Sequence, residues 1–166
     1  ANGRLLQSIK TALRDRRYEG TKIFDRYYTI DELIAVLLTA MRTRAEQQFE
    51  EACDSVVLGR PVRFSDDPGV TARAEEILFK AARFAGFRDI AFQLEPIAAA
   101  HLYHRQSPHR ELALVFDFGG GTLDLTVVEV GGKRPPQVVA TRGVLVGGDD
   151  LDRRIMESLL PYFGSE

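Results

Sequence analysis

The residues best suited to chemistry gather around a run of three glycines. Residues 114–130 read Leu-Val-Phe-Asp-Phe-Gly-Gly-Gly-Thr-Leu-Asp-Leu-Thr-Val-Val-Glu-Val, two apolar runs joined by a turn. Because glycine leaves the backbone N–H uncovered, Gly119 to Gly121 can offer amides to phosphate oxygens, and Thr122 adds a hydroxyl. Asp117 precedes the glycines, where its carboxylate can hold Mg²⁺ directly or through water. The pattern predicts a β-hairpin turn that binds phosphate and a metal; a glycine turn without a ligand is the alternative.

Two further features could touch the same ligand. Glu95 follows an apolar strand pattern and precedes Pro96, so its carboxylate is held in one direction and could orient or deprotonate a water for attack on phosphorus. The alternative is a favourable charge at a helix start. A second glycine pair, Gly147 and Gly148, opens a helix whose first amides suit a phosphate or nucleotide edge. A plain helix start with acidic first-turn residues is the alternative there.

A lysine and two histidines complete the candidates. Lys10 lies beside the apolar face of an expected helix and could reach a γ-phosphate, although a lysine that extends into solvent is the commoner case. His101 and His104 stand three residues apart, but no carboxylate or cysteine completes a metal-binding pattern, so we expect no metal site at the histidines.

The elements that must position these residues predict a mixed α/β fold. Strand–helix–strand units favour parallel strands, whereas the glycine hairpin and the strand after it favour antiparallel ones. Thr29 and Glu32 form a capping-box pattern at the start of the clearest helix, and Gly86 suits a helix C-terminus. The expected helices are 3–17, 29–52, 71–85, 97–103 and 149–163, and the expected strands are 55–64, 89–94, the hairpin that starts at 111–116, and 137–144.

Composition limits the function classes. The chain has 166 residues, 45% of them hydrophobic, and a net charge of −2, which gives no electrostatic reason to expect nucleic acid as a partner. No apolar run approaches the ~18 residues of a membrane span and no signal-peptide pattern opens the sequence, so we expect no membrane association. Cys53 is the single cysteine. A disulfide framework is therefore excluded, and a reducing cytoplasm is the expected location.

Several motifs resemble those of one known family. Residues 117–124 resemble the second phosphate loop of the actin-like ATPases, most closely that of the seventy-kilodalton heat-shock chaperones. Residues 94–100, Leu-Glu-Pro-Ile-Ala-Ala-Ala, are similar to that family's connecting motif, Asn-Glu-Pro-Thr-Ala-Ala-Ala. Residues 147–152 are similar to its Gly-Gly-Glu-Asp-Phe-Asp, and residues 9–13 lie where it carries Ala-Lys-Arg-Leu-Ile. The order and spacing of the three central motifs make the resemblance specific.

The resemblance implies an actin-like ATPase (ribonuclease-H-like) fold and a role for each candidate. Lys10 becomes the γ-phosphate lysine, Glu95 the residue that orients the hydrolytic water, and Asp117 the ligand of a Mg²⁺-bound water and a candidate general base. The implied cofactors are ATP or ADP with Mg²⁺, and the implied partners are unfolded or client polypeptides, bound through a substrate domain, and possible co-chaperones. The remaining implied contacts with nucleotide are the cradle Gly119, Gly120, Gly121 and Thr122, the supporting carboxylate Asp124, and Gly147 and Gly148 near the sugar and phosphates.

The same resemblance suggests a division into lobes. Residues 1–108 correspond to most of lobe I, with a helical outer part over 1–54 and an inner part over 55–108, and residues 109–166 to the start of lobe II. No Asp-x-Gly-Thr-Thr first phosphate loop precedes Lys10. We therefore expect a piece of a nucleotide-binding domain that alone binds nucleotide weakly or not at all, while the intact protein hydrolyses Mg-ATP to drive protein folding or substrate binding.

The sequence also departs from the family pattern. The connecting motif carries Leu94 for asparagine and Ile97 for threonine. Pro61 fits the family's proline switch, but the arginine position that follows aligns best with Glu75, and Arg73 is offset. These departures bear on the coupling between nucleotide and substrate domain more than on hydrolysis.

Other classes share parts of the pattern. A filament-forming, actin-like cytoskeletal protein of bacteria would also carry the Glu-Pro pair and the triple glycine, although the helix from Thr29 fits the chaperones better. A sugar kinase of the same superfold has no supporting sugar-binding pattern. A non-catalytic module with the same fold is opposed by the joint presence of Lys10, Glu95 and Asp117.

Overall fold

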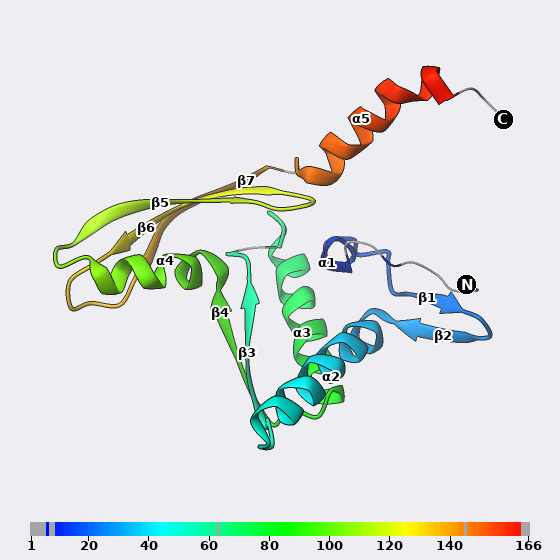
Figure 1. The fold of residues 1–166 in the computed structure, drawn as a ribbon, viewed down its shortest axis with the longest axis horizontal. Helices are drawn as coiled ribbons and strands as arrows, with labels where there is room; N and C mark the ends of the chain where they lie inside the picture. The colour runs from blue at the N-terminus through cyan, green and yellow to red at the C-terminus, as the bar shows by residue number, and fades with distance from the viewer. Residues whose placement is uncertain (1–5, 7–8, 63, 145, 164–166) are drawn as a thin grey trace. The chain divides into compact units, whose positions relative to one another are not determined.

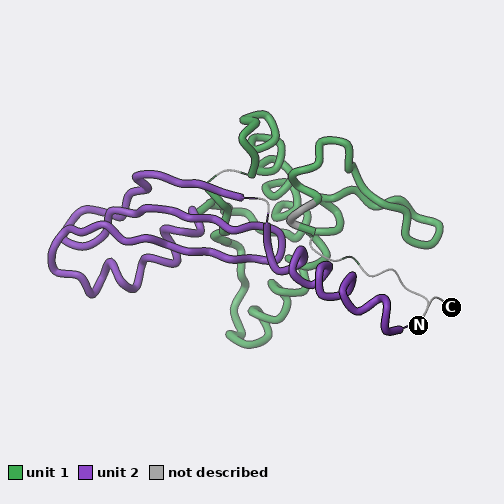
Figure 2. Tube along the Cα trace, turned by 90° about the horizontal axis from the view of Figure 1, so that it is seen from above, with its two compact units in different colours: residues 1–93 green, residues 94–166 purple. Residues whose placement is uncertain are grey.

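The computed structural model describes residues 6, 9–62, 64–144 and 146–163. The chain forms two compact units, unit 1 over residues 1–93 and unit 2 over residues 94–166 (Figures 1 and 2). Both helices and small sheets are present, so the predicted mixed α/β class is confirmed. The elements are α1 (Ile9–Ala12), β1 (Gly20–Ile23), β2 (Arg26–Thr29), α2 (Ile30–Phe49), β3 (Ser55–Arg60), α3 (Pro68–Phe84), β4 (Asp89–Leu94), α4 (Glu95–Gln106), β5 (Glu111–Phe118), β6 (Leu123–Val130), β7 (Gln137–Val144) and α5 (Gly148–Phe163).

The capping box at the start of α2 is confirmed. The Glu32 amide donates to the Thr29 hydroxyl, and the Thr29 amide donates to the Glu32 carboxylate at 3.0 Å. The bond from the Thr29 amide also lowers the pKa of Glu32. The helix ends at Phe49, three residues before the predicted end, because Glu50 adopts a left-handed conformation with φ of 55°.

The first predicted helix, 3–17, is wrong after Ala12. Among the described residues, α1 covers only Ile9–Ala12, and the chain then turns. The Arg73 guanidinium donates hydrogen bonds to the carbonyls of Asp15 and Tyr18. The Asp15 carboxylate accepts a hydrogen bond from the Arg17 amide. These side-chain hydrogen bonds compete with the backbone hydrogen bonds of a helix. Arg73 lies on α3, so a local sequence pattern around residues 9–17 could not predict its bonds.

The hairpin of β1 and β2 was not predicted. The two strands pair antiparallel from Gly20 opposite Thr29 to Ile23 opposite Arg26, with Phe24 and Asp25 in the turn. Four residues are too few for a clear alternation of polar and apolar side chains. The available signal was Thr21 before Asp25 and Tyr27, Tyr28 and Thr29 after it, since threonine and tyrosine favour strands.

The strand–helix–strand unit β3–α3–β4 forms as predicted, with shifted boundaries. Strand β3 stops before Pro61, which lacks the N–H that a strand needs. Helix α3 starts three residues early because Asp67 caps it and Pro68 fits the first helical position. The amides of Arg88 and Asp89 both donate to the Asp54 carbonyl, so β3 and β4 begin side by side and run parallel. Gly86, with φ of 91°, ends α3 as expected.

Arg42 ties together the elements of unit 1. Its side chain is 23% exposed and pairs with Glu46 at 3.0 Å and Asp54 at 3.5 Å. It also donates to the Ala85 carbonyl at 3.1 Å and lies 5.7 Å from the centre of the Phe87 ring. One guanidinium therefore joins α2, the start of β3 and the end of α3. The buried apolar side chains around these elements are Leu13, Ile30, Ile34, Ala35, Phe64, Ala74, Ala81, Ala82, Ala85 and Phe87.

A second ion pair joins β3 to α3. Arg60 lies 3.2 Å from Glu75 and also donates to the carbonyls of Pro61 and Val62. Glu75 on α3 is thus an acid with a basic partner on β3. The Pro61 segment is fixed by this pair.

Unit 2 is an antiparallel sheet in the order β5–β6–β7, with α4 packed on one face. Ala100, Val128 and Val130 are buried between helix and sheet, and Ile97 packs against them. Helix α4 runs from Glu95 to Gln106, so it begins two residues before and ends three residues after the predicted range of 97–103, and Pro96 lies in its first turn. At the other end of α4, the Gly131 amide donates to His104 Nδ1 at 2.9 Å.

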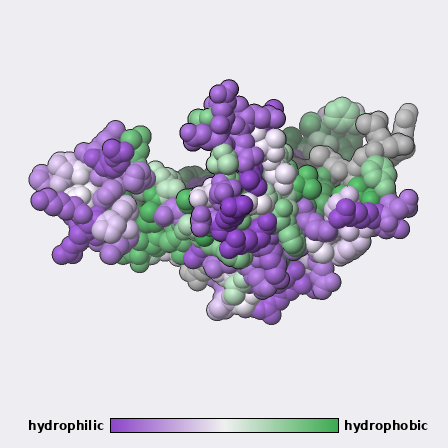
Figure 3. Space-filling view, turned by 90° about the horizontal axis from the view of Figure 1, so that it is seen from below, coloured by the Kyte–Doolittle hydropathy of each residue, from purple (hydrophilic) through white to green (hydrophobic). Residues whose placement is uncertain are grey.

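The opposite face of the sheet and helix α5 carry exposed apolar side chains. Leu112, Leu114 and Phe116 are each about two thirds exposed on β5, and none of the side chains of α5 is buried. On the side drawn in Figure 3, hydrophobic residues lie in patches between larger hydrophilic areas. Within the described residues, no helix has both the length and the apolar character that a membrane crossing requires.

Replacement of Thr29 by alanine tests the capping box. The change removes the hydroxyl that accepts from the Glu32 amide, so we expect the free energy of unfolding of unit 1 to fall by about 1 kcal/mol. Urea denaturation followed by circular dichroism measures it. Thr39→Ala, at an exposed position within α2, is the matched control and should cost nothing because alanine has the higher helix propensity. Equal losses in the two variants would contradict the cap.

The ion pair between Arg110 and Glu129 predicts a pH dependence. The hydrogen bond from Arg110 lowers the pKa of Glu129, with a smaller contribution from the charge of Arg134. A lowered carboxylate pKa means stability that is present above the unfolded-state pKa and is lost as pH falls through the folded-state pKa. Arg110→Gln should raise the pKa of Glu129 in an NMR titration, and Arg134→Gln should raise it less. An unchanged pKa in Arg110→Gln would contradict the assignment.

Candidate functional site

The triple glycine forms the predicted turn between β5 and β6. Strand β5 runs one residue past Asp117, to Phe118, and β6 starts at Leu123. The Gly119 amide closes the turn by donating to the Thr122 carbonyl at 2.8 Å. Gly120 is exposed, and Gly119 and Gly121 are half-buried, so the backbone of the turn is accessible at its tip.

The register of the hairpin brings two carboxylates together. Asp117 on β5 lies directly opposite Asp124 on β6, so both side chains stand on one face of the sheet. Within the described part of the chain, neither carboxylate has an ion-pair or hydrogen-bonding partner. Like charges directly opposite each other are unfavourable, so a cation between or beside them would be favourable.

Mg²⁺ fits this donor set when a phosphate completes it. Mg²⁺ prefers oxygen ligands and commonly keeps several waters, with one or two carboxylates and substrate phosphates beside them. The described residues contain no group of three or more acidic, histidine or cysteine side chains that could hold a metal alone. Asp117 and Asp124 could therefore hold Mg²⁺ through water together with a bound phosphate.

Gly143 on β7 makes room for the Asp124 carboxylate. Gly143 pairs with Asp124 in the sheet, and a β-carbon built on Gly143 would lie 2.7 Å from Asp124 Oδ1. The sequence interpretation missed this residue. A glycine inside a strand pattern is a signal for such a close approach.

The second glycine pair lies against the first turn. The Gly148 amide donates to the Gly119 carbonyl at 3.0 Å, and the Asp149 amide donates to the Gly120 carbonyl at 2.7 Å. The Gly147 amide donates to the Asp150 carboxylate at 3.0 Å. The two glycine motifs are thus brought together, and the amides of the second are engaged within the protein in this structure.

Glu95 is the first residue of α4, and α4 covers the face that carries Asp117 and Asp124. Its side chain is half-buried and takes part in an interaction. Since His104, near the C-terminal end of α4, bonds to Gly131 after β6, the N-terminus of α4 points toward the end of the sheet where the glycine turn lies. Leu94, the N-cap, offers no side-chain bond to the helix, which an asparagine there could do.

The position of Lys10 is described only within its own unit. It belongs to α1 in unit 1, and its side chain lies outside the described part of the structure. The described site thus comprises Asp117, Asp124, the turn from Gly119 to Thr122 and the Gly147–Gly148 segment, with Glu95 on the helix that covers this face.

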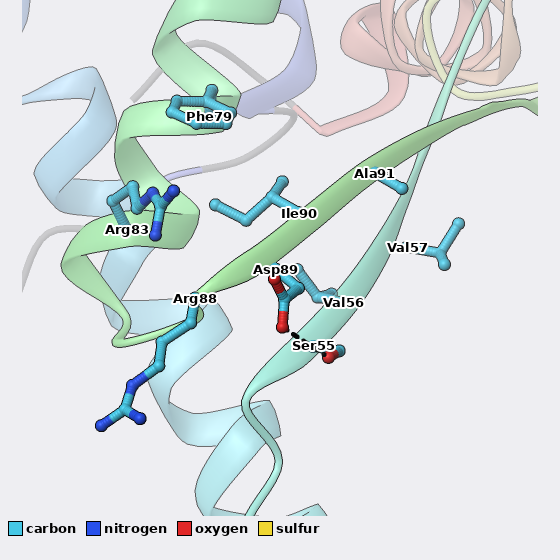
Figure 4. A pocket seen from close by; sticks show the side chains of 9 residues that line it. All are labelled: Ser55, Val56, Val57, Phe79, Arg83, Arg88, Asp89, Ile90 and Ala91. Atoms are coloured by element: carbon cyan, nitrogen blue, oxygen red, sulfur yellow. Dashed lines mark hydrogen bonds between the residues drawn. The ribbon is translucent and has the colours of Figure 1, made fainter.

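Surface hollows among the described residues include two in unit 1. One of about 490 Å³ is lined by residues of β3, β4 and α3, including Phe79, Arg83 and Asp89 (Figure 4). In it the Ser55 hydroxyl donates to the Asp89 carboxylate at 3.3 Å. The other, of about 500 Å³, is lined by residues that include Tyr28 and Phe84. None of the predicted site residues lines either hollow.

Comparison with known families gives one match that covers nearly the whole chain. A family model described as "Hsp70 protein" matches residues 7–166. The match includes the glycine turn, the pair of carboxylates, Glu95, Lys10 and the second glycine pair.

Proposed function

The chain belongs to the Hsp70 family, and on that premise we propose that it contributes the second phosphate loop of a chaperone ATPase. The observation that carries the proposal is the pair Asp117 and Asp124, placed opposite each other beside an accessible glycine turn. Family membership implies nucleotide binding and ATP hydrolysis in the intact protein. The site supplies acceptors for a hydrated cation and donors for phosphate within one hairpin.

The mechanism follows from what each residue can do. The amides of Gly120 and Gly121 donate to phosphate oxygens and stabilise the charge that grows on them during transfer. Glu95 orients the attacking water, and Asp117 is the candidate base that takes a proton from it. Mg²⁺, when bound, neutralises phosphate charge, held by Asp117 through water with Asp124 in support. Positioning and charge stabilisation provide most of the acceleration.

The remaining assignments extend this proposal. Lys10 contacts the γ-phosphate, Thr122 adds a hydroxyl to the cradle, and the Gly147–Gly148 segment lies near the sugar and phosphates. Residues 1–108 correspond to lobe I and residues 109–166 to the start of lobe II. Clients and co-chaperones bind the intact protein in the reducing cytoplasm. The family match does not favour the filament-forming, actin-like alternative.

The coupling between nucleotide and substrate domain is proposed to differ from that of typical relatives. The position aligned with the family's arginine carries Glu75, and its partner is Arg60, next to Pro61. An acid at position 75, where an arginine is expected, supports a different set of coupling residues. The proposed hydrolytic residues Lys10, Glu95 and Asp117 match the family pattern.

Asp117→Asn tests the catalytic assignment. Asparagine keeps the size of the side chain but cannot take a proton and holds a hydrated cation weakly, so Mg-dependent ATP hydrolysis by the intact protein should fall at least ~100-fold. Single-turnover hydrolysis measures this. Asp25→Asn, an exposed aspartate in the β1–β2 turn, is the matched control and should leave the rate unchanged. Unchanged turnover in Asp117→Asn would remove Asp117 from the mechanism.

Isothermal titration of this chain alone with Mg-ATP tests whether the site needs further elements. The family holds ATP between two phosphate loops, and residues 1–166 contain no Asp-x-Gly-Thr-Thr pattern. We therefore expect no saturable binding at micromolar nucleotide. Submicromolar binding would contradict this reading and would show that one loop with its carboxylates suffices.

A further inference from the structure

We propose that Gly147 is a positioning residue, and that the segment Gly147–Asp149 clamps the glycine turn by two of its carbonyls so that the amides of Gly120 and Gly121 are left for phosphate. The clamp is a property of the fold of unit 2. Only the identity of the ligand rests on the proposed function. Gly147 then acts through the turn and not by touching the nucleotide.

The clamp consists of two hydrogen bonds, each between residues 29 apart in the sequence. Gly148 N–H donates to the Gly119 carbonyl at 3.0 Å, and Asp149 N–H donates to the Gly120 carbonyl at 2.7 Å. The first amides of a helix have no partner within the helix, so they are available for this purpose. The start of α5 thereby satisfies its own donors and fixes two successive peptide groups of the turn.

Gly147 allows the two segments to approach. A β-carbon on Gly147 would lie 2.3 Å from the Gly120 carbonyl oxygen and 2.6 Å from the Gly121 nitrogen, both backbone atoms that cannot move aside as a side chain could. Gly147 is also buried, so a ligand has little access to it. Gly148 differs, because a β-carbon there would meet its nearest atoms at 3.8 Å, an ordinary contact distance.

The direction of the bonds matters for an anion. The carbonyls of Gly119 and Gly120 would repel a phosphate if they faced it, and the clamp engages both. Within the described residues, the amides of Gly120 and Gly121 donate to no other group. The clamp therefore occupies the carbonyls of Gly119 and Gly120 and leaves the amides of Gly120 and Gly121 as donors for a phosphate.

The clamp also couples the turn to helix α5. A ligand that changes the conformation of the turn must change the two bonds to Gly148 and Asp149, and a movement of α5 must act on the turn through the same bonds. By linkage the two effects have equal size in binding free energy. The conformation of the phosphate turn and the direction of α5 are thus set together.

The test compares Gly147→Ala with Gly148→Ala in this chain without nucleotide. In Gly147→Ala the clash separates the segments, so hydrogen exchange at the amides of Gly148 and Asp149 should quicken at least tenfold and the amide resonances from Gly119 to Thr122 should shift. Gly148→Ala should keep the Asp149 amide protected within about twofold and leave the turn resonances in place, apart from nearest-neighbour changes.

A third variant covers the case in which Gly147→Ala does not fold. Asp149→Pro removes one donor of the clamp in the first turn of α5, where proline is tolerated. Because the Asp149 carboxylate also lies beside Gly120, the control is Asp149→Ala, which removes the same carboxylate but keeps the amide. The Gly120 and Gly121 resonances should shift further in Asp149→Pro than in this control. Circular dichroism establishes folding. Unchanged exchange and turn resonances in the folded variants would overturn the clamp. Failure of the chain or of the intact protein to bind Mg-ATP would count against the proposed function only, because these measurements use no nucleotide.

Discussion

The antiparallel register of β5 and β6 is the constraint on which the candidate site depends. It places Asp117 opposite Asp124 on the face that α4 covers, and a slip of one residue in β6 would send one carboxylate to the other face. The two charges repel at the end of the ladder, beside the glycine turn. The register thus builds an electrostatic cost into the protein that a hydrated cation with a phosphate would relieve.

That register is maintained from the other end of the sheet. Val128 and Val130 on β6 are fully buried under α4, and their burial selects which face of the strand points inward. Two polar interactions stabilise the same end of the sheet: the ion pair between Arg110 and Glu129, and the hydrogen bond from the Gly131 amide to His104. Apolar burial far from the carboxylates therefore determines where the carboxylates stand.

The sequence predicted what is encoded locally. Thr29 and Glu32 lie three residues apart, and the turn at Gly119 lies within its hairpin, so their patterns sufficed for the capping box and the glycine turn. The short α1 was not predictable, because Arg73, which holds the turns after it, lies 55 or more residues away. The approach of Gly147 to Gly120 is equally non-local. The sequence shows that positions 120 and 147 are both glycine, but only the fold shows that the two glycines have different roles.

This distinction changes how the two glycine motifs should be understood. Gly120 is exposed at the tip of the turn, so the absence of a side chain there serves access to its amide. Gly147 is buried against the same turn, and the absence of a side chain there serves close packing of backbone on backbone. In the proposed phosphate loop, one glycine motif presents donors and the other holds two carbonyls away from the anion. Since the second motif also begins α5, any element that packs on that helix acts on the donors through two hydrogen bonds.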